Sequence, residues 1–335
     1  MSQRLRVLEP GRGRRRPARR WPRWAGFALV FAAIVVAVLL ILMSSKASEP
    51  ATVHVTTNPA APRAARRPPP HTEYGIKLAP ARQQVRLNPK HLRSGLLFDV
   101  HSGAVLWERA PGLEAPIASL TKMMTALVAV QHSKPSDKVL ITREATRFTG
   151  SGVGLLPRGK HVSERALLYG LLLPSGNDAA VALAEHVAGS QARFVAKMNA
   201  QARAMGLRCT HFSTVSGVVD RGNHSCASDL AVLARAVLAD HLLARIVGSR
   251  SAVLPFPIKG GKLYLFNNNP LLLRRYPGAD GVKTGYTNAS GPCLVATARR
   301  GRAWLGVVLL NSANTTGQAE RLLNAGFAKL RRAHG

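Results

Sequence analysis

Apolar and polar positions begin to alternate in short runs near residue 90, after a long stretch that is rich in alanine and proline. Short apolar runs bounded by Gly, Pro, Asn and Ser predict β-strands. Such runs lie at Ser94–Val100, Ala104–Arg109, Ser251–Pro257, Lys262–Phe266, Gly281–Tyr286, Pro292–Ala298 and Trp304–Asn311. The turn residues between the first two runs predict a hairpin.

Elsewhere in this region, apolar residues recur at the three-to-four-residue spacing that is typical of helices. The helical intervals are Ile117–Gln131, Glu164–Leu173, Asp178–Val187, Gln191–Met205, Ser228–Leu242 and Gln318–Arg332. Helices grouped between runs of strands predict an α+β domain with a helical insertion. We assign this domain to residues 89–335, a length that suits one domain with a single core.

Upstream of this domain, residues 25–43 form an apolar run of 19 residues without a charge. A helix of that length spans roughly 28 Å, about the thickness of a hydrocarbon core. Nine arginines precede the run, which predicts a cytoplasmic N-terminus and an extracytoplasmic C-terminal domain. We therefore predict a basic cytoplasmic tail at 1–24, a single-pass cell-membrane anchor at 25–43 and an Ala/Pro-rich linker at 44–88. The alternative is a signal peptide cleaved near Ala47, after which the domain is secreted.

The formal net charge of +31 is the most extreme compositional feature of the chain. A charge of this size is often a sign of nucleic-acid binding. Here the arginines are scattered among alanines without a recognition motif, so we expect no nucleic-acid partner. On an exported domain the same charge favours an anionic surface such as a bacterial wall.

Ser119-Leu120-Thr121-Lys122 supplies the first candidate chemistry, at the beginning of a predicted apolar helix. A serine hydroxyl becomes a good nucleophile only when a base accepts its proton. Residues three apart share one helix face, so Lys122 is predicted to face Ser119. Burial, together with the second cation Lys283, would lower the pKa of Lys122 and leave it partly neutral. The structural alternative is a capped helix start followed by a surface lysine.

Two further polar segments are candidates for the same cleft. Ser175-Gly176-Asn177 joins two predicted helices, and Lys283-Thr284-Gly285 lies in a predicted strand. The first segment can present a hydroxyl and an amide to a substrate. The lysine and threonine of the second suit a carboxylate, and its glycine lets a substrate backbone approach the strand. Taken singly, the first is ordinary turn chemistry and the second is an edge strand with a protective lysine.

The three segments occur in one chain in the order SxxK, SxN and KTG, and this combination is characteristic of one family. With their flanking residues at 116–127, 173–180 and 281–287, they resemble the low-molecular-mass penicillin-binding proteins, specifically the serine D-alanyl-D-alanine carboxypeptidases. The resemblance covers roughly residues 90–332. It implies the penicillin-binding transpeptidase/β-lactamase-like fold, a mainly antiparallel sheet flanked by helices with a helical subdomain.

The resemblance also implies a role for each motif residue. Ser119 attacks the bond between two terminal D-alanines, Lys122 accepts its proton and Ser175 relays a proton. The substrate's side-chain amide is bound by Asn177, and its terminal carboxylate by Lys283, Thr284 and the adjoining Gly285. The backbone N–H groups of Ser119 and Tyr286 form the oxyanion hole.

The implied substrate is a peptidoglycan stem peptide that ends in D-Ala-D-Ala, and β-lactam antibiotics are the implied covalent inhibitors. Neither a metal nor an organic cofactor is implied. Endopeptidases and transpeptidases share these motifs. Many relatives carry a β-rich domain after the catalytic one, whereas only about 50 residues follow Lys283 here. The N-terminal span is therefore expected to replace the usual C-terminal anchor.

Two other functions are compatible with parts of this pattern. A β-lactamase of class A has Ser-Asp-Asn where this chain has Ser175-Gly176-Asn177, and it uses a deacylating glutamate, so the motif disfavours that activity. A catalytically inactive wall-binding or regulatory homologue is the second alternative. The intact set of motif residues argues against it.

The chain has three cysteines, Cys209, Cys226 and Cys293, which are too few and too scattered for a metal site. Disulfides persist outside the cytoplasm. Cys209 and Cys226 bracket a turn-rich segment, and we predict that they pair. Cys293 lies in a predicted strand and is expected to be a small buried hydrophobe.

Overall fold

The computed structural model describes residue 78 and residues 85–148, 150–153 and 156–334. The predicted tail at 1–24, the predicted anchor at 25–43 and nearly all of the linker at 44–88 lie outside these ranges. Among the described residues, no helix combines the length and the apolar character needed to cross a membrane.

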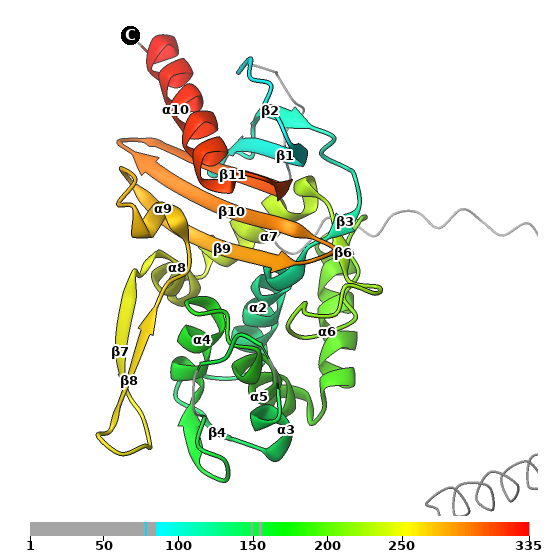
Figure 1. The fold of residues 1–335 in the computed structure, drawn as a ribbon, viewed down its shortest axis with the longest axis vertical. Coiled ribbons are helices and arrows are strands. Elements are labelled where there is room, and N and C mark those ends of the chain that lie inside the picture. The colour runs from blue at the N-terminus through cyan, green and yellow to red at the C-terminus, as the bar shows by residue number, and fades with distance from the viewer. Residues whose placement is uncertain (1–77, 79–84, 149, 154–155, 335) are drawn as a thin grey trace, which may run out of the picture. The chain divides into compact units, whose positions relative to one another are not determined.

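A five-stranded antiparallel sheet forms the upper half of the domain in Figure 1, in the order β2-β1-β11-β10-β9. Its strands are β1 (Leu92–Asp99), β2 (Val105–Arg109), β9 (Ala279–Thr287), β10 (Gly291–Arg300) and β11 (Ala303–Ser312). The predicted N-terminal hairpin joins the C-terminal strands through β1 and β11, where Leu96 pairs with Val308. Since β1 and β11 lie about 200 residues apart in the sequence, this pairing joins the beginning and the end of the domain in one sheet.

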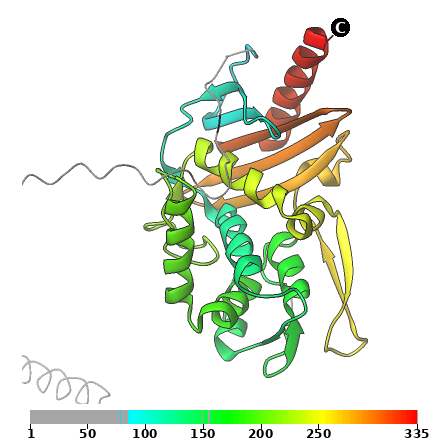
Figure 2. The ribbon, with the colours of Figure 1, turned by 180° about the vertical axis from the view of Figure 1, so that it is seen from behind.

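Alternation along the strands gives the sheet two buried faces. On β11, Leu305, Val307 and Leu309 pack in one core with helix α10 (Thr315–His334), whereas Val308 and Leu310 belong to the core shared with the other helices. Figure 1 shows α10 in front of the sheet, and Figure 2, the view from behind, shows α7 (Ala227–Ala239) and α8 (His241–Gly248) on the opposite face. The predicted α+β fold with a sheet flanked by helices is confirmed.

The helical part lies below the sheet in Figure 1 and is built around α2 (Lys122–His132). Around α2 lie α4 (Glu164–Leu172), α5 (Asn177–Ala188) and α6 (Gln191–Ala204). Short elements that the apolar pattern did not reveal complete this part and its connections: β3 (Ala115–Pro116), β4 (Lys138–Leu140), α3 (Arg143–Thr146), β5 (His161–Ser163), β6 (His224–Ser225) and α9 (Pro270–Leu273).

Two predicted helices were wrong in extent. The interval Ile117–Gln131 is a 3₁₀ turn, η1 (Ala118–Thr121), followed by α2. The interval Ser228–Leu242 crosses from α7 into α8, because the side chain of Asp240 accepts a hydrogen bond from Leu243 N at 2.8 Å and caps a new helix. The strands predicted at 251–257 and 262–266 are present as β7 (Ser251–Pro255) and β8 (Lys262–Phe266), which pair with each other in a two-stranded sheet.

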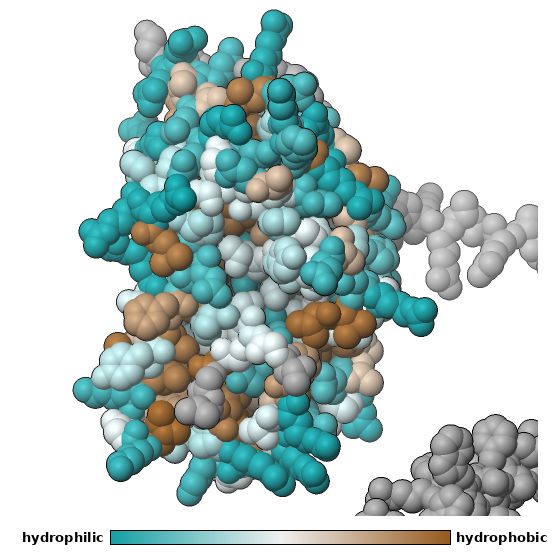
Figure 3. Space-filling view, viewed as in Figure 1, coloured by the Kyte–Doolittle hydropathy of each residue, from teal (hydrophilic) through white to brown (hydrophobic). Residues whose placement is uncertain are grey.

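The β7–β8 hairpin projects beside the helical part, at the lower left of Figure 1. Several of its apolar side chains are exposed, among them Val253, Tyr264 and Phe266. Figure 3, from the same side, shows apolar colouring in this region of the surface. The hairpin is therefore stabilised by fewer core contacts than the main sheet.

Candidate active site

Ser119 and Lys122 are in direct contact at the point where η1 passes into α2. The Lys122 ammonium donates to Ser119 Oγ at 2.8 Å and to the backbone carbonyl of Ser216 at 2.8 Å. In a 3₁₀ turn, residues three apart stand above one another, so the predicted contact forms although Ser119 precedes the α-helix. Lys122 is fully buried and Ser119 is half-buried, so of this pair only the serine is accessible to solvent.

The environment of Lys122 favours the neutral amine. Burial lowers the pKa of Lys122 well below its usual range, and the charge of Lys283 lowers it further. The carboxylate of Asp178 acts in the opposite direction and offsets part of this effect. A neutral amine at 2.8 Å from a serine hydroxyl can accept the proton of that serine.

The segment around Ser216 holds this pair in place from the opposite side. Thr125, one turn along α2, donates to the Val215 carbonyl at 2.6 Å, and Asn223 donates to the Thr121 hydroxyl at 2.8 Å. Gly217 has φ +76° and lies so close to Ala118 that a Cβ here would be 2.0 Å from the Ala118 carbonyl oxygen. Only glycine fits this contact, which brings the Ser216 carbonyl within reach of the lysine.

The edge strand β9 supplies the second side of the site. Lys283 is almost completely buried, and its ammonium donates to the Thr284 carbonyl at 3.0 Å. Burial lowers the pKa of Lys283 from 10.5 to about 7. A Cβ on Gly285 would lie 2.9 Å from the Ile117 carbonyl and 3.2 Å from Ser119 N. The strand β9 therefore packs directly against η1, the nucleophile turn that carries Ser119. The backbone of Tyr286 is next along this strand, and its side chain is exposed.

The loop between α4 and α5 supplies the third side. Ser175 is buried at a φ of +70°, a left-handed conformation that the surrounding loop must impose. The loop is fixed by Asn177 N, which donates to the Ser151 carbonyl at 2.8 Å, and by Asn268, which donates to the Pro174 carbonyl at 3.2 Å. The Ser175 hydroxyl and the Asn177 side-chain oxygen have no hydrogen-bond partner among the described residues. Buried polar atoms of this kind are available to a ligand.

Asp178 is a site residue that the motif analysis did not assign. Its two carboxylate oxygens both accept from Val153 N at 2.9 Å, and Oδ1 also accepts from Ala179 N at 2.8 Å. Burial raises the pKa of Asp178, and these backbone hydrogen bonds oppose the shift. The carboxylate therefore positions the residue 150–153 segment beside Asn177. Its location within the matched segment 173–180 was the one signal that pointed to it.

The backbone carbonyl of Ser216 was also missed as a partner of Lys122. A carbonyl acceptor leaves no side-chain signature in a sequence. The glycine that follows Ser216 was the available signal of an unusual backbone at this point, because Gly217 has the left-handed conformation described above.

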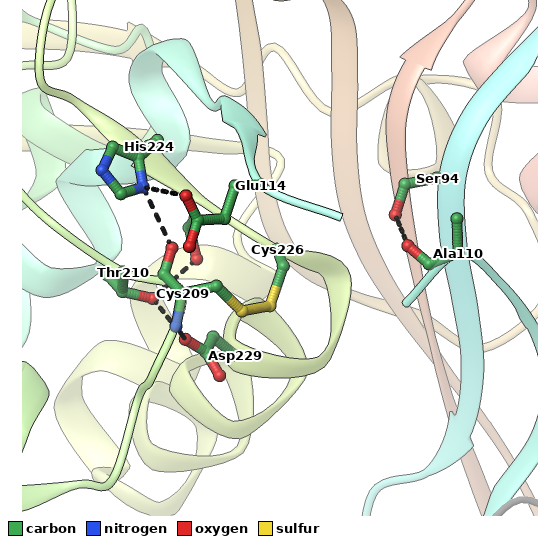
Figure 4. The surroundings of a disulfide bond; sticks show 9 residues. Ser94, Ala110, Glu114, Cys209, Thr210, His224, Cys226 and Asp229 are labelled. Carbon is green, nitrogen blue, oxygen red and sulfur yellow. Dashed lines mark hydrogen bonds and ion pairs between the residues drawn. A yellow bond between two sulfur atoms is a disulfide. The ribbon is translucent and has the colours of Figure 1, made fainter. Parts of the chain in front are cut away.

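The structure contains the disulfide predicted between Cys209 and Cys226 (Figure 4). Asp229 lies beside it and accepts hydrogen bonds from Cys209 N at 2.9 Å and from the Thr210 hydroxyl at 2.7 Å. Because both sulfurs are joined to each other, this cluster offers no thiolate to a metal.

Cys293 is buried in β10, as the sequence predicts. Burial raises the pKa of its thiol to about 11. A thiol with such a pKa contains very little thiolate at neutral pH, so Cys293 is not a nucleophile of this site.

Comparisons with known proteins agree with this geometry. A family model described as Peptidase_S11, D-alanyl-D-alanine carboxypeptidase, matches residues 83–314. The D-alanyl-D-alanine carboxypeptidase DacB2 of Mycobacterium tuberculosis is 39% identical over 241 residues, which are 70% of this chain and 81% of that protein. The carboxypeptidase DacF of Bacillus subtilis is 36% identical over 214 residues, which are 62% of this chain and 54% of that protein. The chain thus matches about half the length of DacF.

Solved structures show the same likeness. A mutant of a Streptomyces DD-transpeptidase superposes with a TM-score of 0.68 at 30% identity, covering 72% of this chain and all of the other. A D-alanyl-D-alanine carboxypeptidase from Mycobacterium tuberculosis superposes with a TM-score of 0.67 at 36% identity, covering 75% of this chain and 94% of the other. The resemblance predicted from the three motifs is confirmed, and the chain belongs to the Peptidase_S11 family of D-alanyl-D-alanine carboxypeptidases.

Proposed function

We propose that the chain is a serine DD-carboxypeptidase that removes the terminal D-alanine from peptidoglycan stem peptides. The observation that carries the proposal is the contact of 2.8 Å between the Lys122 amine and the Ser119 hydroxyl, made by a lysine that burial and Lys283 hold toward its neutral form. The curated relatives DacB2 and DacF bear the same activity in their names.

In the proposed reaction, Ser119 Oγ attacks the carbonyl carbon of the penultimate D-alanine while its proton passes to Lys122. The carbon–nitrogen bond then breaks, and the amine of the departing D-alanine takes a proton that the buried Ser175 hydroxyl relays. Water hydrolyses the resulting ester and frees Ser119. The Ser119 and Tyr286 backbone N–H groups stabilise the oxyanion, in keeping with the close approach of β9 to the nucleophile turn.

The unpartnered side-chain oxygen of Asn177 is proposed to bind an amide of the stem peptide. The terminal carboxylate is proposed to lie beside Lys283 and Thr284 on β9, where Gly285 leaves room for the substrate backbone. A charged lysine and a hydroxyl form charge-assisted hydrogen bonds with a carboxylate. β-Lactam antibiotics present a carboxylate and a reactive carbonyl, so we propose that they acylate Ser119.

A class A β-lactamase uses a glutamate carboxylate to activate the deacylating water. The carboxylate whose charge acts on Lys122 is Asp178, and both of its oxygens already accept backbone hydrogen bonds from Val153. Asp178 is therefore engaged in fixing the backbone, and this arrangement disfavours its use as a class A deacylating base.

We further propose that residues 25–43 anchor the protein in the cell membrane, with the domain on the extracytoplasmic side. The proposal rests on the uncharged apolar run and on the nine arginines that precede it. A cleaved signal ending near Ala47 would place the same domain outside the cell. The N-terminal sequence of the protein recovered from both the membrane fraction and the culture medium distinguishes the two outcomes.

Covalent labelling tests the activity directly. The purified full-length chain, its Ser119→Ala variant and a Ser102→Ala control in an exposed turn are incubated with a fluorescent penicillin. Release of D-alanine from a peptide that ends in D-Ala-D-Ala is then measured, with and without an amine acceptor. Labelling and D-alanine release that depend on Ser119, but not on Ser102, support the carboxypeptidase.

Three results would contradict the proposal. Rapid turnover of the label without peptide cleavage indicates a β-lactamase. Transfer to the acceptor in place of hydrolysis indicates a transpeptidase, the activity in the name of one structural relative. A folded protein that neither reacts with the penicillin nor cleaves the peptide indicates a catalytically inactive wall-binding homologue.

A further inference from the structure

A second cluster of ionisable side chains lies at the far ends of the helices that carry the active site. Asp137 belongs to the connection between α2 and β4, Glu164 is the first residue of α4, and His186 lies in the last turn of α5. One ligand atom from each of the three side chains lies within 4.8 Å of the other two. The backbone fixes this proximity, because Glu164 N donates to the Asp137 carbonyl at 2.9 Å.

Glu164 is the unusual member of the cluster. Its side chain is completely buried, and neither carboxylate oxygen has a hydrogen-bond partner among the described residues. A buried carboxylate whose oxygens accept no hydrogen bond is costly. Such a group needs either a proton or a cation.

The other two residues provide the remaining donors of a cation site. His186 Nε2 and Asp137 Oδ2 are 3.6 Å apart, and their side chains are 27% and 33% exposed. Asp137 is held in position by Lys134 N, which donates to Oδ2 at 2.9 Å. The cluster therefore has one buried carboxylate, one half-buried carboxylate and an imidazole at the boundary with solvent.

We propose that Asp137, Glu164 and His186 form a binding site for a divalent transition-metal ion, with Zn²⁺ as the best match. Two carboxylates and one imidazole are a donor set that Zn²⁺ takes, with water as the fourth ligand. Bonds of about 2.0–2.1 Å in a tetrahedron place ligand atoms about 3.4 Å apart. The observed 3.6 Å between His186 and Asp137 is close to this value, and one Glu164 oxygen lies within 4.8 Å of both ligand atoms.

The position of the site suggests what the ion would do. Helix α2 begins at Lys122, α4 leads into the loop of Ser175, and α5 begins at Asn177. An ion at the opposite ends would join these three elements and stabilise the arrangement on which the active site is built. Its binding energy would add to the stability of the folded state, since the unfolded chain lacks the assembled site.

Zinc binding by the full-length protein, purified without a polyhistidine tag, tests the proposal. Metal content after dialysis against Zn²⁺ is expected to be one ion per chain. At a hundredfold excess over its dissociation constant, Zn²⁺ is expected to raise the melting temperature by about 5–10 °C. Glu164→Gln and His186→Asn are each expected to weaken binding at least tenfold and to abolish most of the thermal shift.

His186→Asn alters a side chain at the surface, so its folding is not in question even if Glu164→Gln proves unstable. The matched controls are Glu114→Gln and His224→Asn, which alter a second His–carboxylate pair with 3.7 Å between Nδ1 and Oε2. They are expected to bind Zn²⁺ as the unaltered protein does. Absence of bound zinc in the unaltered protein, or loss of binding in the His224 control in place of His186→Asn, would overturn the proposal.

Discussion

Replacement of Lys283 by methionine should stabilise the protein at low pH, although Lys283 belongs to the proposed substrate site. In the folded protein, burial lowers the pKa of Lys283 from 10.5 to about 7. This difference corresponds to about 5 kcal/mol of cost for keeping the ammonium charged in the folded state. A methionine of similar volume carries no such cost, and it loses only the hydrogen bond to the Thr284 carbonyl.

The pH dependence follows from the protons bound by each state. Below pH 7 the lysine is protonated in both states, and the folded state carries the full cost. Between pH 7 and 10.5 the unfolded chain binds the additional proton, so the stability of the unaltered protein increases with pH relative to Lys283→Met. The expected gain is about 1.4 kcal/mol per pH unit, or about 3 kcal/mol between pH 7.5 and 9.5.

Urea unfolding measured from pH 6.5 to 9.5 checks this expectation. The free energies of unfolding of the unaltered protein and Lys283→Met should converge as the pH rises. Lys160→Met, which alters an exposed lysine, should show a constant difference from the unaltered protein. A constant difference for Lys283→Met as well would refute the reasoning, because it would mean that Lys283 keeps its proton in the folded state.

Three further perturbations address other parts of the site. Gly217→Ala should cost roughly 1–3 kcal/mol of stability by urea unfolding, because a Cβ would meet the Ala118 carbonyl at 2.0 Å, and it should also slow penicillin labelling. A Cys209→Ser/Cys226→Ser double variant should lose about 3 kcal/mol of unfolding free energy, because the disulfide joins residues 17 apart in the sequence. A reducing agent should lower the stability of the unaltered protein but not that of the double variant. Ser175→Ala should keep a normal melting temperature but label more slowly, since the Ser175 hydroxyl has no partner to lose. An unchanged labelling rate would remove Ser175 from the proposed mechanism.

The local arrangement of the site could be read from the sequence where a motif combines fixed spacing with a local element. Ser119 and Lys122 are three residues apart, and both a 3₁₀ turn and an α-helix bring such residues together. The contact was therefore predicted although the type of helix was wrong. The Cys209–Cys226 pair was predicted for a similar reason, because a short turn-rich segment separates the two residues.

Interactions between distant segments could not be read in the same way. The β1–β11 pairing depends on how the whole chain returns to its beginning, and the apolar pattern of a strand does not identify its neighbour. The α7–α8 boundary was missed because apolar residues continue across it, and one capping aspartate, Asp240, decides where the second helix begins. The Ser216 carbonyl was missed because backbone acceptors depend on conformation alone.

The proposed mechanism requires opposite protonation states of the two buried lysines of the site. Lys122 must be neutral to accept the proton of Ser119, whereas Lys283 must be charged to bind a carboxylate. Burial lowers the pKa of both, but for Lys122 the repulsion from Lys283 is an additional cause that Asp178 offsets only in part. The mutual repulsion disfavours the state in which both lysines are charged, so we expect the pair to hold a single proton. We propose that a substrate carboxylate beside Lys283 raises the pKa of Lys283, so that the proton resides there and the reactive amine at Lys122 is neutral.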